Sequence, residues 1–191
     1  MSARHARFII LSTLLLGVAG AARVHDRLSA SARDIRGATF ADRVADYATL
    51  RGHVLEQLAR SDPRADLSDA ASRNALASAL RNARQRSHSG EVFGNDDIER
   101  ILHIVRADLS RRDPLDYEAL LAEVPVTPPA QVNEFYPEGA PLATVPPLLL
   151  AQLPSLPPSL QYRFLGDALI LLDVDTNLIV DFIPDALTRR T

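Results

Sequence analysis

The chain has 191 residues, of which 47% are apolar and 24% are charged, and its formal net charge is −3. These are ordinary globular values, so they exclude a chain that is disordered throughout, and the length allows one core or two small ones. The absence of a basic cluster argues against nucleic acid or an anionic lipid surface as a partner. The absence of cysteine excludes disulfides and thiolate metal ligands.

The first 22 residues have the three-part layout of a secretory signal peptide: two arginines, an apolar run from Phe8 to Leu16 and a small-residue end. We predict cleavage after Ala21, which places the mature protein in the periplasm or outside the cell. The alternative is an uncleaved segment 1–22 that anchors the protein to the membrane. Against it, the apolar segment is shorter than the roughly 20 residues that span a bilayer.

Residues 39–123 carry the periodicity of a helical region, which follows a polar and flexible spacer at residues 23–38. Apolar residues at helical spacing predict three or four helices. The first helix is expected from Phe40 to Leu58, and the second ends at about Arg86. The third is expected from Asp96 to Leu109 and the fourth from Leu115 to Glu123. Thr39 and Asn95 are the predicted N-caps of the first and third helices, because their side-chain oxygens can accept free N–H groups of the first turn.

A proline-rich segment, residues 124–160, holds ten of the chain's 13 prolines and is therefore stiff and extended. A disordered linker is one interpretation. Apolar residues such as Phe135 and the run Leu148–Leu150 favour another, because a free linker has no reason to carry them. We expect a strap that lies on the domain surface, with one helical turn opened by a proline and ending near Leu153.

Residues 161–187 have the pattern of a three-stranded antiparallel β-meander. The expected strands and turns are Tyr162–Leu165, Gly166-Asp167, Ala168–Val174, Asp175–Asn177 and Leu178–Ile183. Alternation in the last strand places Val180 with Leu178 and Phe182 on one face and Asp181 on the other. The acidic residues are expected in turns or facing solvent. With residues 39–187 as one domain, the predicted fold is α+β: a helical layer, a Pro-rich strap and the meander.

The turn Asp173-Val174-Asp175-Thr176-Asn177 matches the first, third and fifth ligands of a calcium-binding loop, which makes Asp173, Asp175 and Asn177 weak metal candidates. However, Leu178 stands where the loop needs glycine, and Pro184 stands where it needs the bidentate glutamate. We favour a hairpin turn with solvated carboxylates.

Other candidate chemistry is weak. No two histidines have the helical spacing of metal ligands, and the hydroxyls and imidazole of Ser87-His88-Ser89 point apart as sequence neighbours do. The acids Asp96, Asp97 and Glu99 are explained by the positive end of a helix dipole. The sequence therefore predicts no catalytic residue and no cofactor.

Three aromatic residues, Phe93, Phe135 and Tyr136, are the candidate partner-binding residues. They stand in predicted loops, where an aromatic ring is either exposed for a partner or folded into the core as an anchor. Anchoring is the default, and the sequence leaves both interpretations open.

A group of exported bacterial proteins, most of them uncharacterised, resembles this chain in three segments: FADRVADYATLRGHVLEQL, SGEVFGNDD and VNEFYPEGAPLATVPPLLLAQLPSLPPSLQYRFLGDALILLDVDTNLIVDFIPDAL. The shared ending is PP.LL..LP.LP..L.YRF.G..L.L.D...N.IVD.I, and the resemblance covers residues 40–187. It implies a periplasmic location and no particular activity. The part YRF.G..L.L.D is also loosely similar to the C-terminal hairpin of periplasmic nickel/cobalt-homeostasis proteins, whose His-rich segments this chain lacks.

Together these observations favour an exported, non-enzymatic binding or interaction protein of the cell envelope, with a protein or a small ligand as its partner. The alternative is an envelope enzyme or metal-handling protein whose site forms only in the fold, from histidines and carboxylates such as His53, His88, His103, Glu91 and Asp96. A third interpretation is that the edge of the last strand, Leu178–Ile183, pairs with another chain, limited by the charge of Asp181.

Overall fold

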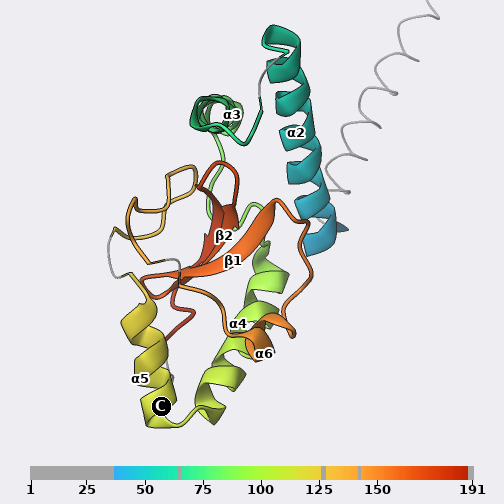
Figure 1. Ribbon diagram of the computed structural model, residues 1–191. Coiled ribbons are helices and arrows are strands. Elements are labelled where there is room, and N and C mark those ends of the chain that lie inside the picture. Colours follow the sequence, from blue (N-terminus) through green and yellow to red (C-terminus); the bar gives the residue numbers. More distant parts are fainter. Residues whose placement is uncertain (1–36, 64–65, 126–127, 142, 189–191) are drawn as a thin grey trace, which may run out of the picture. The chain divides into compact units, whose positions relative to one another are not determined.

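The computed structural model describes residues 37–63, 66–125, 128–141 and 143–188. Within the unit that begins at Thr39, the described residues form five helices followed by a three-stranded antiparallel sheet (Figure 1). The helices are α2 (Phe40–Ser61), α3 (Ala70–Ala83), α4 (Asn95–Arg111), α5 (Pro114–Glu123) and α6 (Pro147–Leu150). The strands are β1 (Leu160–Leu165), β2 (Ala168–Asp173) and β3 (Leu178–Ile183). The predicted α+β fold is confirmed, whereas the predicted signal peptide and residues 23–36 of the predicted spacer lie outside the described residues.

Helix starts follow local chemistry at most positions. Thr39 and Asp42 form a capping box at the start of α2, as the sequence predicts for Thr39. The prediction for Asn95 is wrong, because α4 begins at Asn95 itself and Gly94 is its N-cap. Gly94 has a φ of +72°, which glycine adopts at no steric cost, so the chain enters the helix one residue early.

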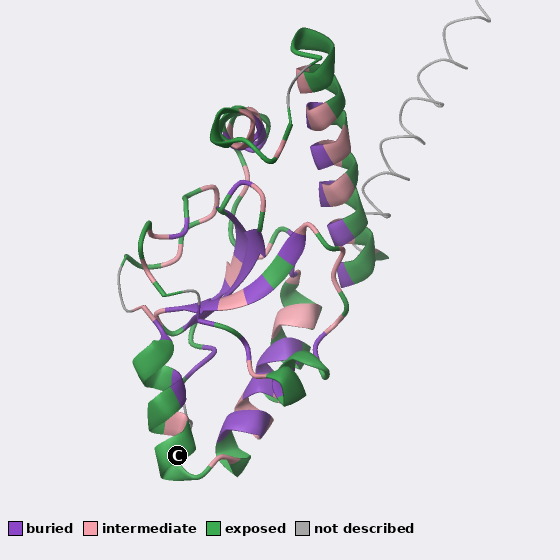
Figure 2. Ribbon diagram, viewed as in Figure 1, coloured by how far each residue is buried: buried purple, intermediate pink, exposed green. Residues whose placement is uncertain are grey.

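One side of α2 is buried. Figure 2 shows this as a purple and pink stripe along the helix, with exposed residues on the opposite side. The buried residues recur at helical spacing and are Phe40, Val44, Tyr47, Arg51 and Val54. The first three contribute to the main core under the sheet, and Val54 packs with Leu76 and Leu80 of α3 in a smaller cluster. Helix α2 is therefore held at two places, by the sheet and by α3.

The sheet has the order β1-β2-β3, and both of its faces are covered. On one face, residues of α2, α4 and α6 pack against alternate residues of the strands, such as Phe164 and Leu171. On the other face, strap residues including Tyr136 pack against Ile170 and Leu172. Because β2 lies between two layers, all of its residues are buried. The first turn is the predicted two-residue hairpin, with Gly166 at a φ of +59°.

A β-bulge changes the faces of β3. Asp181 lies opposite Leu171 and Ile179 lies opposite Leu172, so Val180 is an extra residue in the strand. As a result Ile179 packs on the strap face, whereas Val180 packs in the main core. Phe182 joins Ile179 on the strap face, so the predicted grouping of Val180 with Phe182 is wrong. Regular alternation fails because the bulge inserts one residue.

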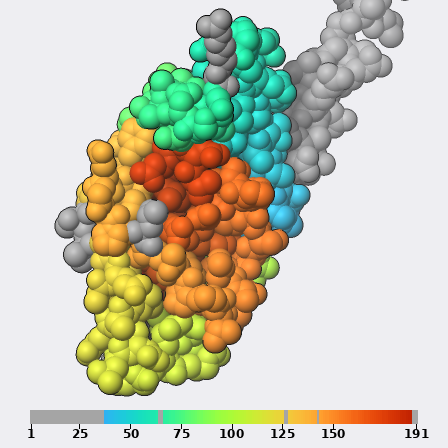
Figure 3. Space-filling view, viewed as in Figure 1, coloured from blue at the N-terminus to red at the C-terminus, as the bar shows by residue number. Residues whose placement is uncertain are grey.

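The strap covers the outer edge of β3. The N–H groups of Asn133 and Tyr136 donate to the carbonyl oxygens of Ile179 and Asn177, both at 2.9 Å, and the N–H of Ile179 donates to Glu134 at 2.9 Å. Strand edges that are covered in this way cannot pair with another chain. The strap therefore occupies the Asn177–Ile179 part of this edge, which leaves less of β3 for the predicted pairing with another chain. Figure 3 shows the strap (light orange) and the meander (dark orange to red) next to each other on the face of the molecule that is in view.

No helix in the described part of the chain combines the length and the apolar character that a membrane span requires.

Candidate functional site

The last part of the loop between α3 and α4, residues 89–94, is held from two sides. The buried carboxylate of Asp181 accepts the backbone N–H groups of Gly90 and Val92 at 2.8 Å and of Phe93 at 2.9 Å. On the other side, the guanidinium of Arg43 donates to the carbonyl oxygens of Val92 at 2.7 Å and Phe93 at 2.6 Å. Charge-assisted hydrogen bonds of this kind are stronger than neutral ones. The acid and the arginine together lock the loop between α2 and β3.

Asp181 corrects the expectation that the acids of the meander face solvent. Its exposed fraction is 0%, because the bulge turns the side chain toward the loop rather than outward. Burial raises the pKa of Asp181 above its usual range, although four backbone N–H groups that bind the carboxylate act in the opposite direction. The side chain is a structural acceptor, and its position in the β3 sequence IVDF gave no sign of this.

Asp173 is the second buried acid. It accepts hydrogen bonds from the Tyr47 hydroxyl and the Arg51 Nε, both at 2.8 Å, and from the backbone N–H of Thr176 at 3.1 Å. Burial and the neighbouring carboxylate raise the pKa of Tyr47, so its hydroxyl keeps the proton that it donates. Asp173 therefore ties α2 to the end of β2.

The same contacts bear on the calcium interpretation of this turn. Arg51 pairs with both Asp173 and Asp175, so a guanidinium lies where a bound cation would have to lie. The side-chain amide of Asn177 donates to the carbonyl oxygen of Tyr136, at 3.2 Å. The three weak metal candidates thus have protein partners. The expectation of solvated carboxylates is wrong for Asp173, whose exposed fraction is 0%.

A third buried charge, Arg84, joins α3 to the sheet and the strap. Its guanidinium donates to the carbonyl oxygen of Val180 at 2.8 Å and to the side-chain oxygen of Asn133 at 3.0 Å. It also lies over the ring of Tyr47, 5.3 Å from the ring centre. Burial lowers the pKa of Arg84 from its usual value. A small cavity of about 240 Å³ beside it is lined by Arg43, Arg84 and Glu91 among others, and these charges already have ionic partners.

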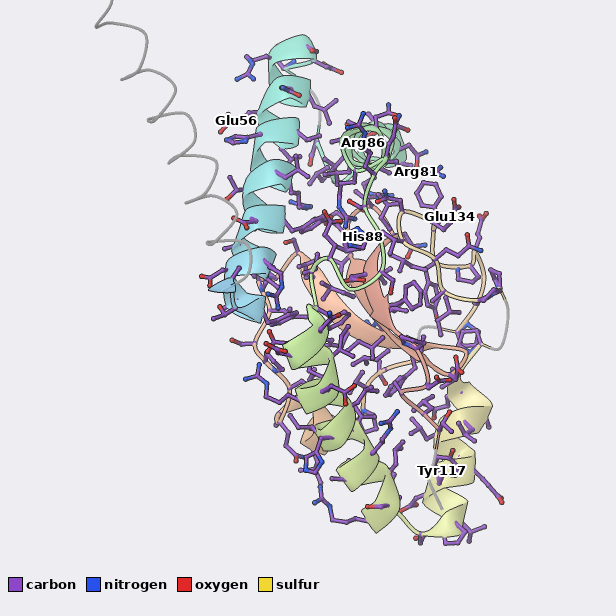
Figure 4. All side chains as sticks on the ribbon, turned by 180° about the vertical axis from the view of Figure 1, so that it is seen from behind. Glu56, Arg81, Arg86, His88, Tyr117 and Glu134 are labelled. Atoms are coloured by element: carbon purple, nitrogen blue, oxygen red, sulfur yellow. The ribbon has the colours of Figure 1, made fainter. Side chains whose placement is uncertain are left out.

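The structure separates the three aromatic candidates. Phe93 has an exposed fraction of 0% and Tyr136 of 2%, so both are anchors in the core and cannot present their rings to a partner. Phe135 is 42% exposed and lies beneath the guanidinium of Arg81, 5.1 Å from the ring centre. Arg81 also pairs with Glu134 at 3.1 Å, and Figure 4 shows these two residues near each other on α3 and the strap.

The histidines that the structure describes do not form a site. His53, His88 and His103 are exposed, and among the described residues no three histidine or acidic side chains gather closely enough to hold a metal ion. The hydroxyl of Ser89 donates to the carbonyl oxygen of Phe182 at 3.2 Å, which gives it a structural partner. In the part of the chain that the structure describes, nothing brings Ser89 and His88 together as nucleophile and base.

An apolar groove of about 720 Å³ runs between the strap and β1. Its lining includes Val145, Leu150, Leu153, Leu156, Leu160 and Tyr162. Beside it, Leu148 is 80% exposed and Leu150 is 47% exposed, whereas Leu149 between them is fully buried. Only the middle residue of the apolar run Leu148–Leu150 is therefore buried. A four-residue helix can bury only one side, so the other two leucines face outward.

Gly94 allows a direct test of the loop's attachment. A Cβ at Gly94 would lie 2.3 Å from the Nη2 of Arg43, and the φ of this residue is +72°. We expect Gly94→Ala to lower the free energy of unfolding by about 1–3 kcal/mol, because it displaces Arg43 and strains the backbone. Urea denaturation measures the change.

The matched control is Gly52→Ala in α2, where a Cβ meets nothing within 4 Å. This replacement should stabilise the protein by about 0.5–1 kcal/mol, because alanine favours a helix more than glycine does. Equal stability of Gly94→Ala and the wild type would show that Arg43 does not hold the loop in this way.

No family model, curated protein or solved structure matches this chain. A fold of this class serves many functions, so the function has to be inferred from the surface and its chemistry.

Proposed function

We propose that this is an exported protein of the cell envelope that binds an apolar segment of another envelope protein in the groove between its strap and β1. Export is supported by the layout of residues 1–22 and by the resemblance to exported bacterial proteins. Binding rather than catalysis is supported by the polar groups described above, which hold the fold together. The observation that carries the proposal is an apolar groove bordered by two exposed leucines.

Leu150 matters because its side chain is exposed and is also part of the groove's lining. Leu148 is not part of the lining; it lies two residues earlier in the same short helix, about 200° away around the helix axis, so the two leucines flank the exposed side of α6. Burying a leucine side chain contributes about 1.5–3 kcal/mol. An occupant that crosses the exposed side of α6 and enters the groove would gain binding free energy from the burial of both leucines. Contiguous apolar surface with polar surroundings is typical of such interaction sites.

The alternative, an envelope enzyme or a metal-handling protein, has no comparable support. The histidines and acids that it would need are apart or already paired in the described residues. Phe135 is an exposed aromatic residue outside the groove, but its ring is partly covered by Arg81.

The test uses a photo-crosslinking amino acid placed at Ala151, an exposed residue that lines the groove, in the full-length protein produced in its own cells. One dominant crosslinked envelope protein is expected. The double replacement Leu148→Ser and Leu150→Ser should reduce its yield at least tenfold, because two exposed leucines no longer contribute their burial. Both side chains are exposed, so the thermal midpoint should stay unchanged.

The matched control is Leu115→Ser at the start of α5, because Leu115 is 76% exposed and is not part of the groove. This replacement should leave the crosslink intact. A crosslink that survives the double replacement, or that Leu115→Ser removes equally, would refute binding at the groove.

A further inference from the structure

Arg163 brings a positive charge to the mainly apolar groove. It lines the groove together with Gln161, two residues earlier on β1. Its Nε is shielded from solvent and has no hydrogen-bond partner, and its Nη2 donates to the side-chain oxygen of Gln161. Within the described residues no carboxylate lies within 4.0 Å of this guanidinium, and none of the groove's lining residues is acidic. A guanidinium always carries its charge and has five donors, so Arg163 lacks the anionic partner that it is suited to bind.

The backbone of β1 supplies a second feature. The N–H of Phe164 donates away from β2, to the carbonyl oxygen of Ala143 in the strap, at 3.4 Å. The N–H of Leu160 also points away from β2 and donates to the carbonyl oxygen of Pro157 at 2.9 Å. Alternate residues of an antiparallel strand have the same orientation. The N–H of Tyr162, between these two, therefore faces the groove.

Part of the β1 edge already pairs with the strap. Thr144 forms an antiparallel bridge with Arg163, so an extended chain lies along the upper part of the β1 edge. The groove continues from that bridge along Leu160–Arg163. Because the outward N–H groups of Leu160 and Phe164 are already bonded, the segment that fits can pair with this edge only at Tyr162.

We infer that the occupant of the groove is an extended peptide segment with apolar side chains and one carboxylate, which Arg163 binds. The apolar side chains fill the groove, the peptide backbone meets the N–H of Tyr162, and the carboxylate completes the donors of the guanidinium. The carboxylate comes either from an acidic side chain or from the C-terminus of the partner. This inference rests on the proposed function, because it specifies the partner of the same groove.

The experiment measures binding of three fluorescein-labelled hexapeptides of alternating leucine and threonine to the purified protein by fluorescence anisotropy. The first ends in a free carboxylate, the second is amidated and carries one glutamate, and the third is amidated and neutral. Hydrogen bonds to charged groups are stronger than neutral ones, so at least one charged peptide should bind about tenfold more tightly than the neutral one. The tighter of the two charged peptides identifies the source of the carboxylate.

Arg163→Gln should bring the charged peptides to the affinity of the neutral one. The matched control is Arg111→Gln, which removes an exposed arginine at the end of α4 and should change nothing. Equal affinities for all three peptides, or unchanged affinities in Arg163→Gln, would overturn the role of Arg163. If those equal affinities fell with Leu148→Ser and Leu150→Ser, binding at the groove would still stand. Binding of laurate with no binding of any peptide would overturn both proposals in favour of a lipid.

Discussion

Replacement of Asp181 by alanine is expected to lower the free energy of unfolding by about 3 kcal/mol or more. The carboxylate is fully buried and accepts N–H groups from Gly90, Val92 and Phe93. Without it, these three donors lose their acceptor in a region closed to water, and each unsatisfied group costs about 1–3 kcal/mol. Local rearrangement of the loop recovers part of this cost. Urea denaturation followed by circular dichroism measures the difference.

Two further variants make the result specific. Asp181→Asn keeps one acceptor oxygen and should lose less stability than Asp181→Ala. Asp167→Ala removes an exposed acid from the β1–β2 turn, where no hydrogen bond of its carboxylate is seen in the described residues, and should stay within about 0.5 kcal/mol of the wild type. A loss at Asp181 no larger than the loss at Asp167 would mean that Asp181 does not hold the loop.

Replacement of Arg51 by methionine should be destabilising by about 3–5 kcal/mol, which is the usual cost of removing one partner of a buried ion pair. Arg51 Nε lies 2.8 Å from Asp173, whose exposed fraction is 0%. Without the guanidinium, Asp173 keeps only the Tyr47 hydroxyl and turn N–H groups. An uncompensated buried charge is therefore the main cost. The measurement is the denaturation midpoint and slope in urea.

The same helix offers a matched control. Arg60 pairs with Glu56 at 3.9 Å, and the side chains of both residues are about two-thirds exposed, at 68% and 67%. Figure 4 shows Glu56 on the outer side of α2. Arg60→Met should change stability by less than about 0.5 kcal/mol, because solvent screens exposed pairs. Asp173→Asn combined with Arg51→Met should lose less than the sum of the single changes. Additive losses would argue against a direct pair.

The buried acids Asp173 and Asp181 explain how a chain without disulfides holds its helices to its sheet. Asp173 ties the middle of α2 to the end of β2, and Asp181 ties the loop before α4 to β3. Arg84 then joins α3 to the sheet and the strap. Polar links of this kind specify one arrangement of elements that apolar packing alone would leave less defined.

Local features of the sequence predicted the elements well because their causes are local. The capping box at Thr39 and the two-residue turn at Gly166 depend on residues within a few positions of each other. Helical periodicity identified the buried side of α2, including Phe40, Val44 and Tyr47. The strap could be expected from its prolines and apolar residues together.

The candidate site could be predicted only in part. The sequence singled out Phe93, Phe135 and Tyr136, of which only Phe135 reaches the surface. It did not indicate the groove, because the groove is formed by the strap and β1 as they fold back on each other. One signal was available: Leu148–Leu150 lies in a helical turn too short to bury all three side chains.

By itself the sequence determined the helices, the strands and most of their boundaries, since propensity, capping and turn chemistry act over a few residues. Only the tertiary structure decided which acids are buried, which face of β3 each residue occupies and where the apolar surface is left open. Asp181 contacts Gly90, which is 91 positions away in the chain. Its role depends on a bulge and on a loop that meet only in the fold, and no local pattern records such a meeting.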